Sequence, residues 1–276
     1  MTKRRIFCDA LGQGVAFRYP PQRVVSLVSG LTEALFAMGC GERVVGVSAY
    51  CGRYVPNLNV PVVGDYLRVD ESLLHEVQPD LLLLTTGVQR PLAQHLLRQG
   101  WPVFVLPLPN SIYGIWENVV ILGGLMGEVQ AARALLTRWQ AGWAEVAARA
   151  LRPRPRVYVD LWFGPHPRTP GALTVILDVI EVAGGQNIFG YRAAAYLPLD
   201  LSAVVAAQPQ VWVLFSEPEY PLDAEPLKHE RGWDKMLPDL RVIVSTVQRG
   251  QNLIHDGPSL LETAAWLQAH LREVVQ

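Results

Sequence analysis

Four side chains of this sequence could handle a proton or a metal ion: His166, Glu217, His255 and Asp256. Imidazole nitrogens and carboxylates are common metal ligands, and the same groups are the commonest general acids and bases. His255 could coordinate a metal ion, although a lone histidine is more often a core or surface residue. These residues alone keep an enzymatic interpretation open.

The sequence lacks the motifs that would support such an interpretation. It contains no His-Glu-x-x-His zinc motif, no Gly-Lys-Ser/Thr phosphate loop, no Gly-x-Ser-x-Gly elbow and no dinucleotide-binding glycine fingerprint. Gly123, Gly124 and Gly127 do not have the spacing of that fingerprint. We therefore expect no catalytic residue, no metal site and no intrinsic cofactor.

A second group of residues is suited to binding rather than to reaction. Aromatic side chains that are not used in a core can form flat walls for a large ring. Packing would explain any one of them, so their placement in the two halves of the chain carries the argument. The aromatic residues expected in loops after strands or before helices are Tyr50, Tyr66, Trp162, Phe163 and Tyr196.

Composition limits the class of partner. Half of the 276 residues are hydrophobic, enough to bury the cores of one or two domains. The formal net charge is −1, and no basic run could bind a nucleic-acid backbone. The longest apolar runs have the length of a strand, far below the roughly 20 residues that span a bilayer. We expect a soluble globular protein.

The start of the chain and its cysteines bear on location. The basic residues at 3–5 are followed by polar residues, whereas a signal peptide needs an uninterrupted apolar segment. The three cysteines match no metal or redox spacing, which fits a reducing compartment. The sequence as given predicts a cytoplasmic protein. The alternative is a periplasmic or cell-surface protein whose leader has been removed.

Short apolar runs alternate with segments of helical period along the first half of the chain. This rhythm indicates strands that alternate with helices and form a mostly parallel sheet. A long helical segment follows at 127–151 and is stopped by Pro153 and Pro155. A second series then begins at 156–162, with a helix near 175–183, strands at 211–215 and 241–245, and a last helix from Ser259.

We therefore predict an α/β protein of two Rossmann-like lobes with mostly parallel sheets, joined by a single long helix. The expected boundaries are 1–125 for the first lobe, 126–152 for the connecting helix and 153–276 for the second lobe. Gln-Pro at 78–79 and again at 208–209 suggests a repeat of one lobe in the other. Both dipeptides could also simply end helices. The acidic, proline-rich segment at 217–225 is expected to be a solvated excursion.

Several segments together resemble one family. They are RVVSLVSGLTEALFAMG at 23–39, RVVGVSAY at 43–50, VPVVG at 60–64, VQPDLLLL at 77–84 and EVAGGQNIF at 181–189. This combination is similar to the solute-binding proteins that serve cobalamin, haem and ferric-siderophore importers, and most similar to the cobalamin-binding members. The resemblance covers nearly the whole chain and implies that one bulky ligand binds in a cleft between the two lobes.

The resemblance assigns ligand contacts in both lobes. Tyr66 and Tyr196 occupy positions where the cobalamin-binding members carry tryptophan, and Tyr50 matches a tyrosine of those members. Ser29 lies at the start of the first expected helix, whose positive end would face the edge of the sheet where ligands bind. Ser29 or Thr32 could instead serve only to cap that helix.

Further contacts are implied in the second lobe. Trp162 and Phe163 precede a rigid loop at 164–168 that resembles a segment leading into the cleft. Arg168, with His166, could meet amide, phosphate or carboxylate groups of a ligand, or could lie in solvent. His255 lies near the last cleft loop of the family, where it could coordinate a cobalt or iron centre of the ligand.

The chain departs from the family at the residues that dock a membrane transporter. Members that deliver to a permease present one carboxylate per lobe, but the matching positions here hold Ser72 and Ser202. Glu71 and Asp200 lie one and two positions away, and a helix turns about 100° per residue, so they would point elsewhere. An ABC permease is therefore a doubtful partner.

The resulting hypothesis is an intracellular, non-catalytic relative that binds cobalamin or a related corrinoid for storage, sensing or handover. One alternative is the haem- or siderophore-binding component of an ABC importer. The other is a chelatase-like enzyme, because two-lobed α/β folds also host enzymes that insert metals into tetrapyrroles, and fold alone does not decide function.

Overall fold

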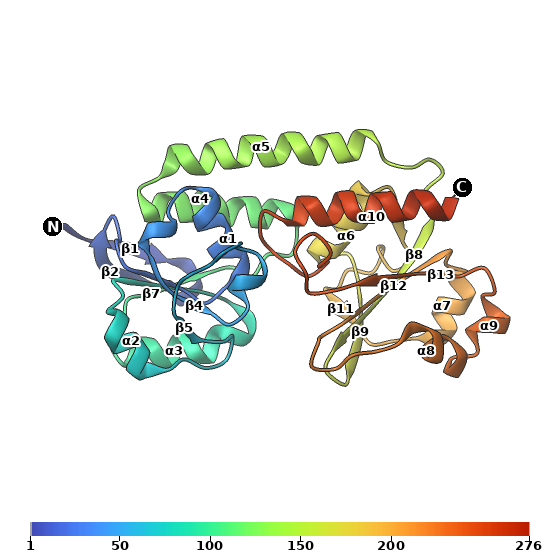
Figure 1. The fold of residues 1–276 in the computed structure, drawn as a ribbon, viewed down its shortest axis with the longest axis horizontal. Helices are drawn as coiled ribbons and strands as arrows, with labels where there is room; N and C mark the ends of the chain where they lie inside the picture. Colours follow the sequence, from blue (N-terminus) through green and yellow to red (C-terminus); the bar gives the residue numbers. More distant parts are fainter. Residues whose placement is uncertain (1, 276) are drawn as a thin grey trace. The chain divides into compact units, whose positions relative to one another are not determined.

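The computed structural model describes residues 2–275, which divide into two compact α/β units. The first unit holds the residues up to Pro109 with Tyr113–Trp139 and Asp256–Pro258. The second holds Asn110–Ile112, Gln140–His255 and the residues from Ser259 on. The prediction of two α/β lobes is confirmed (Figure 1).

The sheet of the first unit is fully parallel, in the order β5-β4-β3-β6-β7. Its central strands are almost wholly apolar and buried, as expected for a sheet covered on both faces. The strands are β3 (Val24–Ser26), β4 (Val44–Ser48), β5 (Val62–Gly64), β6 (Leu81–Thr85) and β7 (Val103–Leu106).

Helices cover both faces of this sheet. Figure 1 shows α1 and α4 on one side of it and α2 and α3 on the other. Their bounds are α1 (Ser29–Ala37), α2 (Glu71–Val77), α3 (Arg90–Arg98) and α4 (Ile112–Met126). The sequence analysis assigned no helix at 112–126, because α4 is apolar along nearly its whole length and so shows no helical alternation.

An N-terminal hairpin was also not predicted. β1 (Thr2–Cys8) pairs antiparallel with β2 (Gln13–Tyr19), and the Cys8 thiol donates a hydrogen bond to the Val105 carbonyl of β7 at 3.3 Å. The hairpin therefore lies beside the edge strand of the sheet, which protects an edge from unwanted pairing. The available signal in the sequence was the alternation of Val15, Phe17 and Tyr19 with smaller or charged residues, and the first two of these are buried.

The second unit has a mixed sheet in the order β11-β9-β8-β12-β13, with β10 also paired to β8. The core strands β8 (Arg156–Phe163), β12 (Val211–Ser216) and β13 (Arg241–Ser245) are parallel. The expectation of a loop at 164–168 was wrong, because the chain reverses at Gly164 (φ 57°) and returns as strand β9 (His166–Pro170), antiparallel to β8. The two short strands are β10 (Gln186–Asn187) and β11 (Tyr196–Leu197).

The long helix expected at 127–151 is α5 (Val129–Ala148), which begins in the first unit and ends in the second. The remaining helices belong to the second unit: α6 (Val175–Val182), α7 (Leu201–Ala207), α8 (Ala224–Glu230), α9 (Trp233–Met236) and α10 (Leu260–Val275). Within residues 2–275, every helix is too short or too polar to cross a membrane.

The two Gln-Pro dipeptides form the same connection in both units. Gln78 ends α2 and Gln208 ends α7, each in the left-handed conformation, with φ of 44° and 47°. An arginine just before or at the start of the first core strand then closes each helix end. Arg23 Nε donates to the Gln78 carbonyl at 3.2 Å, and Arg156 Nε donates to the Gln208 carbonyl at 2.8 Å. The dipeptides therefore end helices and mark a structural repeat.

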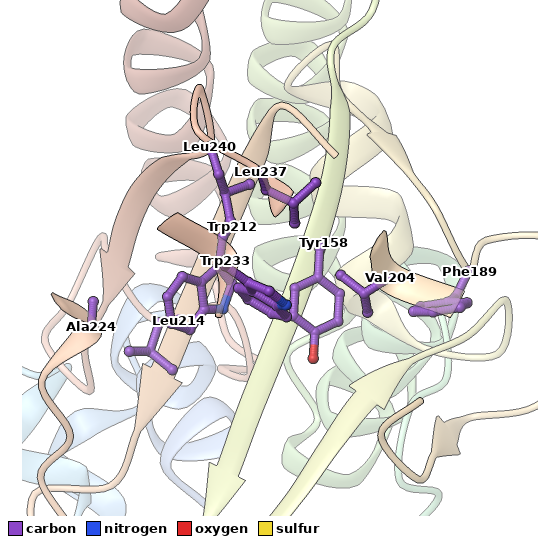
Figure 2. Close-up of a cluster of buried hydrophobic side chains, with 9 residues drawn as sticks. All are labelled: Tyr158, Phe189, Val204, Trp212, Leu214, Ala224, Trp233, Leu237 and Leu240. Carbon is purple, nitrogen blue, oxygen red and sulfur yellow. The ribbon is translucent and has the colours of Figure 1, made fainter. Parts of the chain in front are cut away.

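A cluster of large rings fills the core of the second unit on one face of the sheet (Figure 2). Tyr158, Trp212 and Trp233 are all fully buried. The ring of Trp233 meets Tyr158 edge-on at 5.7 Å between centroids and Trp212 at 5.1 Å. Such edge-to-face contacts add to the free energy gained by burial.

A buried ion pair lies beside this cluster. Arg231 Nη1 donates to Asp160 Oδ2 at 2.6 Å, and the two side chains are 6% and 0% exposed. The guanidinium carbon also lies 4.8 Å from the ring centre of Trp233, within range of a cation–π contact. Burial raises the pKa of Asp160, while the guanidinium opposes that rise. The pair joins β8 to the residue that ends α8.

Arg231→Met should lower the free energy of unfolding by about 3–5 kcal/mol, because it leaves the Asp160 carboxyl buried without its partner. Urea denaturation followed by tryptophan emission measures this loss. Arg138→Met, at an exposed position of α5, is the matched control and should change stability by less than about 0.5 kcal/mol. Equal stability of the two variants would show that the ion pair is dispensable.

Candidate functional site

Three of the predicted ligand residues meet at the carboxyl edge of the first sheet. Ser29, Tyr50 and Tyr66 follow the neighbouring strands β3, β4 and β5. The rings of Tyr50 and Tyr66 are stacked, with centroids 4.9 Å apart and planes 21° apart. A hydrogen bond of 3.2 Å joins Ser29 Oγ to Tyr66 Oη. Ligands of open α/β sheets bind at this edge.

The hydroxyl of Tyr66 stays protonated at neutral pH. Burial raises the pKa of Tyr66 well above its usual value, and the nearby negative charge of Asp256 raises it further. The guanidinium carbon of Arg53 lies 4.9 Å from the ring centre of Tyr50, within range of a cation–π contact. Each ring of the stacked pair is therefore held by a further contact besides the stacking.

The start of α1 differs from the capping arrangement considered for Ser29 and Thr32. The N-cap residue is Val28, which makes no side-chain cap. Ser29 is the first helical residue and bonds to Tyr66, while Thr32 Oγ1 donates back to the Val28 carbonyl at 2.9 Å. Neither side chain caps the helix, because the threonine hydroxyl finds an acceptor four residues earlier.

Asp256 packs against the first turn of α1. A Cβ atom on Gly30 would lie only 2.2 Å from Asp256 Oδ1 and 2.6 Å from its carbonyl carbon. Only glycine allows this approach, which puts a carboxylate near the positive end of a helix.

His255 is only 4% exposed and already has an interaction partner in the protein. Its backbone amide donates to the Asn252 carbonyl at 3.4 Å. Among residues 2–275, no three side chains of His, Cys, Asp or Glu are grouped as a metal site would require. A role for His255 at a bound metal stays a prediction.

In the second unit, the two aromatic residues that end β8 make different contacts. Consecutive residues of a strand point to opposite faces of the sheet. Phe163 meets Tyr196 edge-on, with centroids 5.8 Å apart, and also contacts Phe215. Tyr196, the first residue of β11, is 46% exposed. The structure therefore brings Phe163 and Tyr196 together and separates them from Trp162.

Trp162 has a neighbour that the sequence analysis missed. It packs against the buried ring cluster, and Tyr220 stacks on it with centroids 6.1 Å apart and planes 12° apart. Tyr220 lies in the segment expected to be a solvated excursion. The available signal was an aromatic residue placed soon after the carboxyl end of a buried strand.

Arg168 and His166 are exposed on β9. Arg168 Nη1 donates to the carbonyl of Pro167 at 2.9 Å. Their ligand contacts stay predictions.

The residues considered for transporter docking are engaged within their own units. Glu71 is the first residue of α2, and its Oε1 accepts hydrogen bonds from His95 Nε2 at 2.9 Å and Gln99 Nε2 at 2.8 Å. Both hydrogen bonds lower the pKa of Glu71, and the one from His95 has the larger effect. Ser72 donates its backbone amide to Asp70, the N-cap residue.

Asp200 is the N-cap of α7. Its Oδ1 accepts from Ser202 Oγ at 2.6 Å and from the Ala203 amide at 3.0 Å, which lowers the pKa of Asp200. The two N-caps, Asp70 and Asp200, thus correspond. Tyr66 and Tyr196 each lie four residues before these caps.

Gly30→Ala should reduce the free energy of unfolding by about 1–3 kcal/mol, because the new methyl group must displace Asp256. Gly124→Ala, at a helical glycine with open space around it, is the control and should be neutral or slightly stabilising. Urea denaturation compares them. Equal stability of the two variants would mean that the loop at Asp256 is not held against α1.

His95→Ala should raise the pKa of Glu71 toward its ordinary value of 4.5, because it removes the main hydrogen bond to the carboxylate. Glu71 titrates from a lowered pKa in the native chain, so any stability it contributes is present above pH 4.5 and lost as the pH falls through that lowered value. Carboxyl NMR titration of both proteins measures the shift. An unchanged Glu71 titration would contradict the contact.

Two sequence comparisons show what this chain is similar to. The sequence model of the family described as periplasmic binding protein matches residues 24–238. A "Cobalamin-binding protein" of Halobacterium salinarum is 30% identical over 213 residues. That alignment covers 74% of this chain but only 57% of the relative's length.

Solved structures share the fold. The periplasmic heme-binding protein RhuT from Roseiflexus sp. RS-1 superposes with a TM-score of 0.79 at 24% identity, over 92% of this chain and 99% of that one. The periplasmic vitamin B12 binding protein BtuF of Vibrio cholerae gives 0.68 at 20% identity, over 93% and 99%. The family is one of solute-binding proteins, which agrees with the prediction of a binder rather than an enzyme. Because the family model matches well over half of this chain, the chain belongs to the periplasmic binding protein family.

Proposed function

We propose that this chain binds a bulky tetrapyrrole metal chelate, cobalamin or a related corrinoid, without converting it. The observation that carries this proposal is the stacked pair of Tyr50 and Tyr66 at the carboxyl edge of the first sheet. Phe163 with Tyr196 supplies a second aromatic pair at the second sheet. Partly exposed rings held by other rings suit a large ligand with a flat apolar face.

The state of Tyr66 favours a corrinoid over haem. A tyrosine binds ferric iron of haem through its oxygen, as an axial ligand. Here Tyr66 Oη is already bonded to Ser29, and burial and Asp256 hold the phenol in its neutral form. In this proposal Tyr66 meets the ligand with its ring, because iron ligation would require breaking the bond to Ser29 and removing the phenol proton against burial and Asp256. The Halobacterium relative, named for cobalamin, supports the same ligand class.

We further propose that the protein stores, senses or hands over its ligand inside the cell, rather than docking on a permease. The engagement of Glu71 Oε1 by His95 and of Asp200 Oδ1 by the start of α7 supports this proposal, because these internal contacts orient both carboxylates within their own units. A haem- or siderophore-binding component of an importer is the alternative. Ser29, Arg168 and His255 complete the proposed set of ligand contacts.

The first experiment is a titration of the purified protein with cobalamin, cobinamide, haem and a ferric siderophore. We expect saturable one-to-one binding of a corrinoid, measured through changes in the visible spectrum of the ligand. Tyr66→Ala and Tyr196→Ala should each weaken binding by about tenfold, as the loss of one aromatic contact implies. Tyr66→Phe retains the ring and should bind nearly as well as the native chain.

Other outcomes would contradict the proposal in distinguishable ways. Tighter binding of haem, with a spectrum dependent on the Tyr66 hydroxyl, would support the importer alternative. Insertion of metal into a metal-free tetrapyrrole would show a chelatase. Binding of none of the four compounds would remove the proposed function altogether.

A further inference from the structure

Tyr220 lies where no ligand contact was expected. The segment between β12 and α8 leaves the carboxyl end of a central parallel strand, the edge where α/β sheets bind ligands. We infer that Tyr220 is a ligand-contacting residue of the second unit, held in place by its stacking on Trp162 and by the bond between Glu217 and Gly164. This inference deepens the proposed function and rests on it.

Three contacts hold the segment against β8. At its start, Glu217 Oε2 accepts a hydrogen bond from the amide of Gly164, in the turn after β8, at 2.9 Å. In its middle, the Tyr220 ring stacks on Trp162. Beyond α8, the buried bond from Arg231 to Asp160 ties the chain to β8 again.

These contacts follow one strand. Asp160 and Trp162 are two residues apart on β8 and so share a face of the sheet. Gly164 follows directly after the strand. The anchors therefore run from the buried core to the carboxyl edge, and Tyr220 stacks on the middle one.

The burial of the two stacked rings differs. Trp162 is half-buried and packs against the ring cluster of the core, whereas Tyr220 remains 38% exposed on the outside of the stack. An exposed ring contributes little to the core. A ring already fixed by stacking and by its anchored segment loses little conformational freedom when a ligand covers it. Tyrosine also combines a large apolar face with a polar tip, which suits a ring system with polar substituents.

Phe163 and Tyr196 form the other aromatic pair at this end of β8, on the opposite face of the sheet. A ligand that lies over the carboxyl edge can touch both pairs. Tyr220 thus extends the aromatic surface of the second unit beyond the predicted residues.

The test uses the full chain and cobinamide or cobalamin as the probe. Tyr220→Ala should raise the dissociation constant about tenfold, and Tyr220→Phe should leave it within about twofold, because the ring face makes the contact. Met236→Ala is the matched control. Met236 is a 45% exposed apolar residue of the same unit, on α9, before the amino end of β13, and its loss should not change affinity.

Thermal unfolding of each variant separates binding from folding. The inference holds if Tyr220→Ala keeps the native melting temperature and loses affinity. It is overturned if the native chain binds a corrinoid and Tyr220→Ala binds equally well, or if Tyr220→Phe loses as much affinity as Tyr220→Ala. If the native chain binds no corrinoid, the proposed function fails first and the inference fails with it.

Discussion

Parallel pairing of strands is the constraint on which both candidate surfaces depend. When neighbouring strands run in the same direction, the loops that follow them leave from one edge of the sheet. In the first unit this brings Ser29, Tyr50 and Tyr66 together although they are far apart in sequence. In the second unit it places Trp162 near the segment that carries Tyr220. The side chains that follow these strands then determine what can bind.

The same connection between helix and strand occurs in both units. A left-handed glutamine ends the helix, the following proline prevents its continuation, and an arginine binds the last carbonyls. Because Asp70 and Asp200 begin the corresponding helices, the positions of Tyr66 and Tyr196 ahead of them are also repeated. The two tyrosines nevertheless have different partners, Tyr50 in one unit and Phe163 in the other.

The elements with clear periodicity could be predicted from the sequence. Buried strands such as β6 and β12 show as short apolar runs, and α5 shows as a long segment without proline. Two elements could not be predicted in this way. α4 is apolar on nearly all sides, and β9 contains two prolines, which suggest a loop until pairing with β8 supplies its hydrogen bonds.

The site was partly predictable for a related reason. The resemblance assigned Tyr50, Tyr66 and Tyr196 by position. Only the structure shows which contact each ring makes. Tyr220 was missed because its partner, Trp162, is 58 residues earlier in the chain and only the fold brings them together. Its acidic, proline-rich surroundings predict solvation, and the segment is indeed mostly exposed. Stacking against a ring that is itself packed on the core is what gives an exposed tyrosine a fixed position, and a fixed position makes it useful for binding.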